Sequence, residues 1–443
     1  MLQFPRMAIR RDAAGASTVT RVQHESIEAA KLVHTLQLSA DGTRLGVLAD
    51  KSMLVVDLTE DEPKVTGTRE TSRRGTGLAF GSVAGTGSER QPVLACCDAN
   101  SEVHLFPVPA LDKQAFLLGH AMSVLSAVSV APEDDLIATG DREGRIRISE
   151  FPVAPLIRGV AFLHDRYITS LSWIATATAF SKPPTTLPDR LLLSTAADGR
   201  AALWDVQGEA PVLLGHTSVV PALTPGGQAP AVTVAAGASS ASGPADSEVE
   251  AVTRASGAKQ RPLTVFTYCS HPITACATQG ADVVVAVYGV PQALVFRLEH
   301  NPTGAGTADP GAAEDADAVT FAFQGRVLLP APVAALAPAV EQGTFLALDC
   351  QGAVHALTGG DSPALCADHA GAAALCSAVT ETGVDVAAAG KAAEKVLPSP
   401  LDLAFAVGGV KNVKGAAAAI QATAEAAAAA AAAEATGSGA AGQ

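Results

Sequence analysis

The chain has 443 residues, of which 30 are Lys or Arg and 44 are Asp or Glu, and its formal net charge is −14. Phosphate binding needs clustered basic side chains, so this balance argues against a protein that holds nucleic acid mainly through its own surface. Aromatic residues are only 4% of the chain, so many short apolar elements must share the burial of a core. The seven cysteines include no C-x-x-C pair, which speaks against a zinc or thioredoxin-like motif and indicates a reducing compartment.

Short apolar runs of strand length follow one another from residue 30 to residue 215. They lie at 45–49, 53–58, 93–97, 103–106, 136–139 and 146–149. Turn-forming residues separate them, for example Asp-Gly-Thr at 41–43 and Asp-Gly-Arg at 198–200. Many short strands at even spacing predict an all-β sandwich, barrel or propeller.

A repeat decides among these three architectures. Leu-Leu-Gly-His occurs at 117–120 and again at 213–216, with Leu163-His164 at the matching place between them. The segments that start at Glu143 and Asp198 align without a gap, and the second one ends in Trp204-Asp205. A repeat of about 40–45 residues that opens near Gly-His and closes at Trp-Asp resembles the WD-repeat family. The sequence therefore predicts a β-propeller of seven four-stranded blades.

The histidines of the repeat have a structural interpretation. Each can hydrogen-bond the acid in the turn between the second and third strands, and a Ser or Thr and the Trp can complete that network. We therefore expect structural roles for five residues: His120, His164, Asp198, Trp204 and His216. No nucleotide-binding, nucleophile-elbow or metalloprotease motif occurs, and no His, Cys and carboxylate group has ligand-like spacing. We expect no catalysis and no bound metal or cofactor.

After residue 216 the pattern loosens. Residues 224–262 and 300–317 are expected to be flexible insertions, because they are rich in small and polar residues and lack periodicity. Strand-like runs continue at 263–267, 283–287, 293–298, 319–323, 326–329, 344–348 and 353–357. The propeller is thus predicted over 1–399, and 400–443 reads as a helix that ends in a disordered Ala/Gly-rich tail. Apart from alanine stretches, no apolar run reaches the ~18 residues of a membrane span, so no membrane partner is expected.

The segment 139–150 carries three arginines within six residues, Arg142, Arg145 and Arg147. If Ile146 and Ile148 face the neighbouring blades, strand alternation places Arg145 and Arg147 on the other side. On a protein of net charge −14, such a cluster suits carboxylates of a partner. A solvated rim without a partner explains the same residues equally well.

The same segment carries a closer resemblance. Thr139-Gly-Asp-Arg-Glu-Gly-Arg-Ile-Arg-Ile-Ser149, preceded by Gly119-His120, resembles the non-catalytic WD-repeat subunit of the tRNA (guanine-N7)-methyltransferase. The match runs through 119–134 and 137–149, continues in 157–173 and 191–199, and so covers roughly 120–205. The resemblance implies a subunit that binds, stabilises and positions a separate methyltransferase as a heterodimer. That partner binds S-adenosylmethionine and forms N7-methylguanosine in the tRNA variable loop, so this chain meets tRNA through the complex.

The resemblance also implies which residues meet the partner. They are Arg145, Arg147 and Arg166. Together with Arg142 of the arginine cluster and Asp165, these are the predicted partner-binding residues. Two departures occur here: Leu163 stands where the family usually has Gly, and Arg166 stands where it favours Glu. Lys411 and Lys414 lie where the family has a basic helical tail that can help hold tRNA; a plain solvated helix is the alternative. The family implies a nuclear location, with cytoplasm also open.

Two other kinds of function remain open. A general WD-repeat adaptor, such as a substrate receptor of a ubiquitin ligase, would bind a peptide and leave tRNA methylation unaffected. A propeller enzyme would gather acids and histidines around the central channel.

Overall fold

The structure is a computed structural model. It describes residues 7–11, 17–21, 33–223 and 272–366, except for 50, 61, 72, 86–88, 121–122, 181–186, 209, 302–317, 340 and 350–352. The two predicted insertions therefore lie almost wholly outside the described residues, as do the run at 263–267 and the predicted helix and tail at 400–443. Lys411 and Lys414 belong to that tail.

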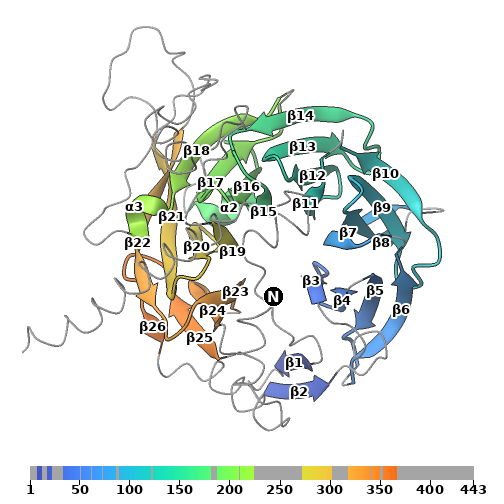
Figure 1. The fold of residues 1–443 in the computed structure, drawn as a ribbon, viewed down its shortest axis with the longest axis horizontal. Coiled ribbons are helices and arrows are strands. Elements are labelled where there is room, and N and C mark those ends of the chain that lie inside the picture. The colour runs from blue at the N-terminus through green and yellow to red at the C-terminus, as the bar shows by residue number, and fades with distance from the viewer. Residues whose placement is uncertain are drawn as a thin grey trace, which may run out of the picture.

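Six four-stranded sheets form a ring in which each sheet is one blade (Figure 1). In every blade the four strands are consecutive in the chain and antiparallel, so each blade is a simple meander. The first blade consists of β3 (Val33–Leu38), β4 (Arg44–Ala49), β5 (Ser52–Asp57) and β6 (Lys64–Glu70). The second consists of β7 (Gly75–Ala84), β8 (Arg90–Asp98), β9 (Glu102–Pro107) and β10 (Ala115–Gly119). The third consists of β11 (Leu125–Val130), β12 (Leu136–Asp141), β13 (Arg145–Glu150) and β14 (Ile157–Phe162).

The other three blades follow the same order around the ring. The fourth blade consists of β15 (Ile168–Ala175), β16 (Arg190–Ala196), β17 (Arg200–Asp205) and β18 (Val212–Ser218). The fifth consists of β19 (Ile273–Gln279), β20 (Asp282–Val287), β21 (Gln292–Asn301) and β22 (Ala318–Leu328). The sixth consists of β23 (Val333–Pro338), β24 (Thr344–Asp349), β25 (Val354–Thr358) and β26 (Leu365–Cys366).

The prediction of an all-β propeller with four-stranded blades is confirmed, but the expected count of seven blades is wrong for the described chain. One cause is the pair of runs at 319–323 and 326–329, which are two parts of the single strand β22. The register between β21 and β22 shifts at Val295 and Phe296, and the facing Gly325 has φ +155°. A bulge of this kind interrupts the apolar pattern without ending the strand.

A two-stranded sheet of β1 (Met7–Arg11) and β2 (Ser17–Arg21) lies between the first and last blades (Figure 1). Its pairing is antiparallel, with Met7 opposite Arg21. The described part of the ring is thus six blades and one hairpin.

The core lies between adjacent blades. The second strands are continuous apolar runs because both of their faces are covered; every residue of β12, β16 and β20 is buried. One apolar cluster joins Leu191 and Leu203 of the fourth blade to Val285 and Phe296 of the fifth. A blade therefore buries its faces only against its neighbours, as the repeat architecture requires.

The meander gives the ring two distinct faces. Turns between the second and third strands and connections to the next blade lie at one set of strand ends; turns between the first and second strands lie at the other. We call the first the arginine face and the second the opposite face. Two short helices, α2 (Thr176–Ala179) and α3 (Val220–Leu223), follow β15 and β18. Among the described residues, no helix is long and apolar enough to cross a membrane.

Candidate partner-binding site

Strand β13 alternates as the sequence predicts. Ile146 and Ile148 are fully buried, whereas Arg145 and Arg147 project from the other side of the strand. In the register with β14, Arg145 lies opposite Phe162 and Arg147 opposite Val160. The two arginines therefore share a blade surface with two residues of the outer strand.

Asp141 shapes the turn that leads into β13. Its Oδ1 accepts hydrogen bonds from the backbone N–H groups of Glu143 and Arg145, both at 2.9 Å. Burial by itself raises the pKa of Asp141, but hydrogen bonds from His120 and from the Arg145 amide outweigh it and lower that pKa below its ordinary value. A buried, charged carboxylate thus holds the arginine-bearing turn in one conformation.

The loop 163–166 packs directly on this turn. Gly144 has φ +83°, and a Cβ there would lie 2.2 Å from the carbonyl oxygen of His164 and 2.9 Å from that of Arg166. The loop is fixed from its other side too, because the Asp165 N–H donates to Asp198 Oδ2 at 3.1 Å. The turn and the loop, 20 residues apart in sequence, therefore form one rigid surface on the arginine face.

Charged side chains cover this surface. Arg145 is 41% exposed, forms an ion pair with Glu143, and has its Nε 3.7 Å from Asp141 Oδ2. Arg142 Nη2 lies 3.6 Å from Glu143 Oε1. Asp165 is 68% exposed and 3.2 Å from Arg200 Nη1. These pairs are weak in water, so the charges remain accessible to a partner that offers better geometry.

Arg147 differs from the other arginines of the segment. Its Nε donates to Ser149 Oγ at 2.9 Å, its Nη1 to the Gly119 carbonyl at 2.9 Å and its Nη2 to the Ala154 carbonyl at 2.8 Å. Burial lowers the pKa of Arg147. Because Gly119 belongs to the preceding blade, this guanidinium joins two blades. The predicted site is thus split: Arg142, Arg145, Asp165 and Arg166 share the surface of the turn and loop, and Arg147 is engaged within the ring.

The hydrogen-bond network expected around the repeat histidines is present in the fourth blade. His164 Nδ1 lies 3.1 Å from Asp198 Oδ2, and its Nε2 lies 2.8 Å from Ser194 Oγ. Trp204 Nε1 donates to the same Ser194 oxygen at 2.9 Å. Burial raises the pKa of Asp198, but hydrogen bonding and charge attraction from His164 outweigh it, so the net pKa is lowered. This network fixes the base of loop 163–166.

The other two histidines depart from this pattern to different degrees. His120 Nε2 lies 2.7 Å from Thr139 Oγ1 and its Nδ1 3.4 Å from Asp141 Oδ2, so the third blade has the network without a tryptophan. His216 makes no side-chain hydrogen bond to any residue that the structure describes. In the following blade the turn between the second and third strands, 288–291, contains no acid that could pair with it.

Sequence reasoning missed two features of this face. Arg200 donates to the Leu163 carbonyl at 3.3 Å and pairs with Asp165, so it links the fourth blade's turn to the loop. The Asp-Gly-Arg pattern at 198–200 predicts the turn but not this contact.

The second feature is a cluster in the second blade. Asp98, Glu102 and His104 each place one potential ligand atom within 4.8 Å of the others. Asp98 Oδ1, however, already accepts the Asn100 and Glu102 N–H groups, as Asp141 does in its own turn.

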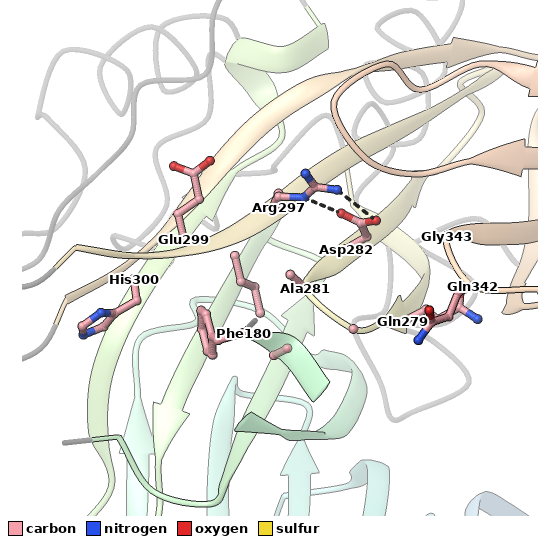
Figure 2. Close-up of a pocket in the computed structure, with 12 residues that line it drawn as sticks. Phe180, Gln279, Ala281, Asp282, Arg297, Glu299, His300, Gln342 and Gly343 are labelled. Carbon is pink, nitrogen blue, oxygen red and sulfur yellow. Dashed lines mark hydrogen bonds and ion pairs between the residues drawn. The ribbon is translucent and has the colours of Figure 1, made fainter. Parts of the chain in front are cut away.

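A cavity of about 670 Å³ opens on the opposite face, beside α2 and the turns at 280–281 and 342–343 (Figure 2). Arg297 crosses it to Asp282 and also pairs with Asp361. The hydrogen bond to Asp282 is the main cause of the raised pKa of Arg297. None of the predicted site residues lines this cavity, and its Arg297 is already paired with carboxylates of this chain.

Comparison with known proteins supports the resemblance seen in the sequence. The chain is 31% identical over 169 residues to the "tRNA (guanine-N(7)-)-methyltransferase non-catalytic subunit wdr4" of Danio rerio, covering 38% of this chain and 36% of that protein. It is 30% identical over 138 residues to the Homo sapiens subunit WDR4, covering 31% and 29%. It is 25% identical over 185 residues to the subunit TRM82 of Saccharomyces cerevisiae, covering 39% and 37%. The matched stretch covers between 29% and 37% of the length of these relatives.

Two further comparisons concern the fold. The lipoprotein LpqB β-propeller domain family matches residues 5–80. The solved β-propeller domain of Cps50 (Swd1) from Myceliophteria thermophila aligns over 78% of this chain and 91% of that one, with 12% identity and a TM-score of 0.44. Among curated proteins, the relatives of this chain are thus named as non-catalytic subunits of the tRNA (guanine-N7)-methyltransferase, and their names agree with a non-enzymatic role.

Proposed function

We propose that this chain binds, stabilises and positions a separate S-adenosylmethionine-dependent methyltransferase that forms N7-methylguanosine in the tRNA variable loop. The observation that carries the proposal is the similarity to relatives named as the non-catalytic subunit of that enzyme, at 31% identity over 169 residues. The name of a non-catalytic subunit implies a catalytic partner. The rigid surface formed by the 141–145 turn and the 163–166 loop is our candidate for the contact.

The geometry of this surface suits a partner of mixed charge. Arg142 and Arg145 offer guanidinium groups for carboxylates, and the exposed Asp165 offers a carboxylate for a basic residue. Complementary charges arranged this way steer association and select the partner.

The proposed mechanism is thermodynamic. A rigid propeller face that binds only the competent conformer of the methyltransferase shifts its population toward that conformer. S-adenosylmethionine and the methyl transfer belong to the partner, and tRNA is met through the complex. A contribution of Lys411 and Lys414 to tRNA binding and a nuclear location of the complex remain predictions of the resemblance.

The test is a binding and activity assay with the cognate methyltransferase. We expect Arg142→Glu combined with Arg145→Glu to weaken the association at least tenfold and to lower methylation of tRNA guanine N7 in parallel. Arg147→Glu is unsuitable, because it would remove contacts inside the ring. Lys113→Glu combined with Lys64→Glu, two exposed charge reversals on other parts of the ring, is the matched control and should bind normally.

Two results would overturn the proposal. The first is failure of the unaltered chain to associate with the methyltransferase. The second is full activity of the lone catalytic chain on tRNA. Normal methylation with the Arg142→Glu and Arg145→Glu variant would favour a general adaptor instead.

A further inference from the structure

The outer strand of the third blade, β14, exposes an unusual amount of apolar surface. Among the described residues eleven large hydrophobic side chains are exposed, and five of them lie between 153 and 162. Three of these five lie on β14 itself, Ile157 (54%), Val160 (36%) and Phe162 (71%), and the other two, Val153 (55%) and Leu156 (54%), lie in the turn before it. The other outer strands, β6, β10, β18, β22 and β26, carry at most one each.

This strand is also an open sheet edge. The order within the blade is β11-β12-β13-β14, so among the strands that the structure describes β14 pairs on one side only (Figure 1). Natural edges are protected by charges, by Pro or by a covering segment, because unpaired backbone groups otherwise recruit another strand. The outer strand β6 has such charges in Lys64, Arg69 and Glu70. β14 has only Arg158, which pairs with Glu150 at 3.1 Å.

The neighbouring blade covers one side of β14 and leaves the other open. A Cβ on Gly159 would lie 2.3 Å from Pro211 Cδ in the fourth blade, so that side is packed. Ala161 is buried on the same side. Val160 and Phe162 alternate with these two residues and stay exposed.

The apolar edge is continuous with the proposed contact surface. Phe162, at the end of β14, lies directly opposite Arg145 in the neighbouring strand. An extended segment laid along β14 would therefore place its apolar residues on Val160 and Phe162 and could place a carboxylate beside Arg145. Main-chain hydrogen bonds to the edge would give affinity, and the alternate side chains would give specificity.

From this edge we infer that β14 accepts an extended segment of the methyltransferase as a fifth strand of the third blade, a segment with alternating apolar residues and an acidic residue near Arg145. The inference rests on the proposed function for the identity of the partner. It predicts a contact that is mainly backbone and apolar, in addition to the charged one.

The test compares outer strands that differ in their exposed apolar residues. The double variant Val160→Thr and Phe162→Thr keeps strand-forming residues and alters only exposed side chains, so its thermal unfolding should match the unaltered chain. We expect its affinity for the cognate methyltransferase to fall on the order of tenfold or more. Val212→Thr on β18 and Leu328→Thr on β22 are the matched controls and should bind normally. Hydrogen–deuterium exchange should show the amides of 157–162 becoming protected in the complex.

Each other outcome overturns the inference and is distinguishable. Unchanged affinity of the double variant, without new protection at 157–162, rejects the edge contact and leaves the proposed function standing. Slow exchange in the free chain, at those amides of 157–162 that point away from β13, would mean that another part of this chain covers the edge. Self-association that the double variant abolishes would assign the edge to a second copy. If the unaltered chain does not bind the methyltransferase, the proposed function fails first.

Discussion

Gly144 packs against the main chain of His164 so closely that a Cβ on it would lie 2.2 Å from the His164 carbonyl oxygen. This contact seats the arginine-bearing turn of the third blade on the loop that leads into the fourth. It explains how residues from two blades form one surface.

Gly144→Ala tests that contact. The residue has φ +83°, so alanine meets both an unfavourable backbone conformation and a clash with backbone atoms. We expect a loss of more than about 2 kcal/mol in the free energy of unfolding, measured by urea denaturation. Gly42→Ala is the control, because Gly42 has φ +70° with nothing within 4 Å of its Cβ, and it should lose about 1 kcal/mol. Equal losses in the two variants would contradict the close packing.

The two tryptophans allow a matched test of the histidine network. Trp204→Phe removes the hydrogen bond to Ser194 Oγ from a buried site, and we expect it to cost about 1–3 kcal/mol. Trp173 Nε1 is buried without a hydrogen-bond partner among the described residues, so Trp173→Phe removes an unsatisfied donor and should change stability little. Thermal unfolding of both variants measures the difference. A larger loss for Trp173→Phe would count against the network.

Arg147 and Arg145 are neighbours on one strand with different predicted roles. Arg147→Ala removes three hydrogen bonds, two of them to backbone carbonyls, and should cost about 2–4 kcal/mol of stability. Arg145→Ala removes surface ion pairs and should cost less than about 1 kcal/mol. Denaturant titration of both variants checks the order. If the order were reversed, Arg147 would not join the two blades as described.

The lowered pKa of Asp198 predicts acid sensitivity. A carboxylate with a lowered folded-state pKa contributes stability that is complete above its unfolded pKa and is lost as pH falls through the folded value. We therefore expect the melting temperature to decrease when the pH is lowered beneath about 4, where the carboxylates of the unfolded chain begin to bind protons. Asp198→Asn should lower the melting temperature at pH 7 and reduce its pH dependence in acid. A variant that kept the full pH dependence would show that Asp198 is not responsible.

Much of the fold is readable from local pattern. The predicted run at 146–149 falls inside β13, with its isoleucines buried and its arginines outside, because strand alternation is a property of the backbone. The bonds from Asp198 to His164 and from Trp204 to Ser194 follow from the repeat spacing. The blade count was wrong, because the pattern of β22 is interrupted at Gly325 although the strand continues.

The sequence by itself determined a propeller of four-stranded blades, the turn that carries Arg142 and Arg145, and the resemblance that suggests a partner. Only the tertiary structure decided that Arg147 binds the Gly119 carbonyl of the preceding blade, that Asp165 meets Arg200, and that β14 is an exposed apolar edge. Local pattern depends on neighbours within a few residues, whereas these two contacts join residues 28 and 35 positions apart, the first between adjacent blades and the second between a blade's turn and the loop that leads into it.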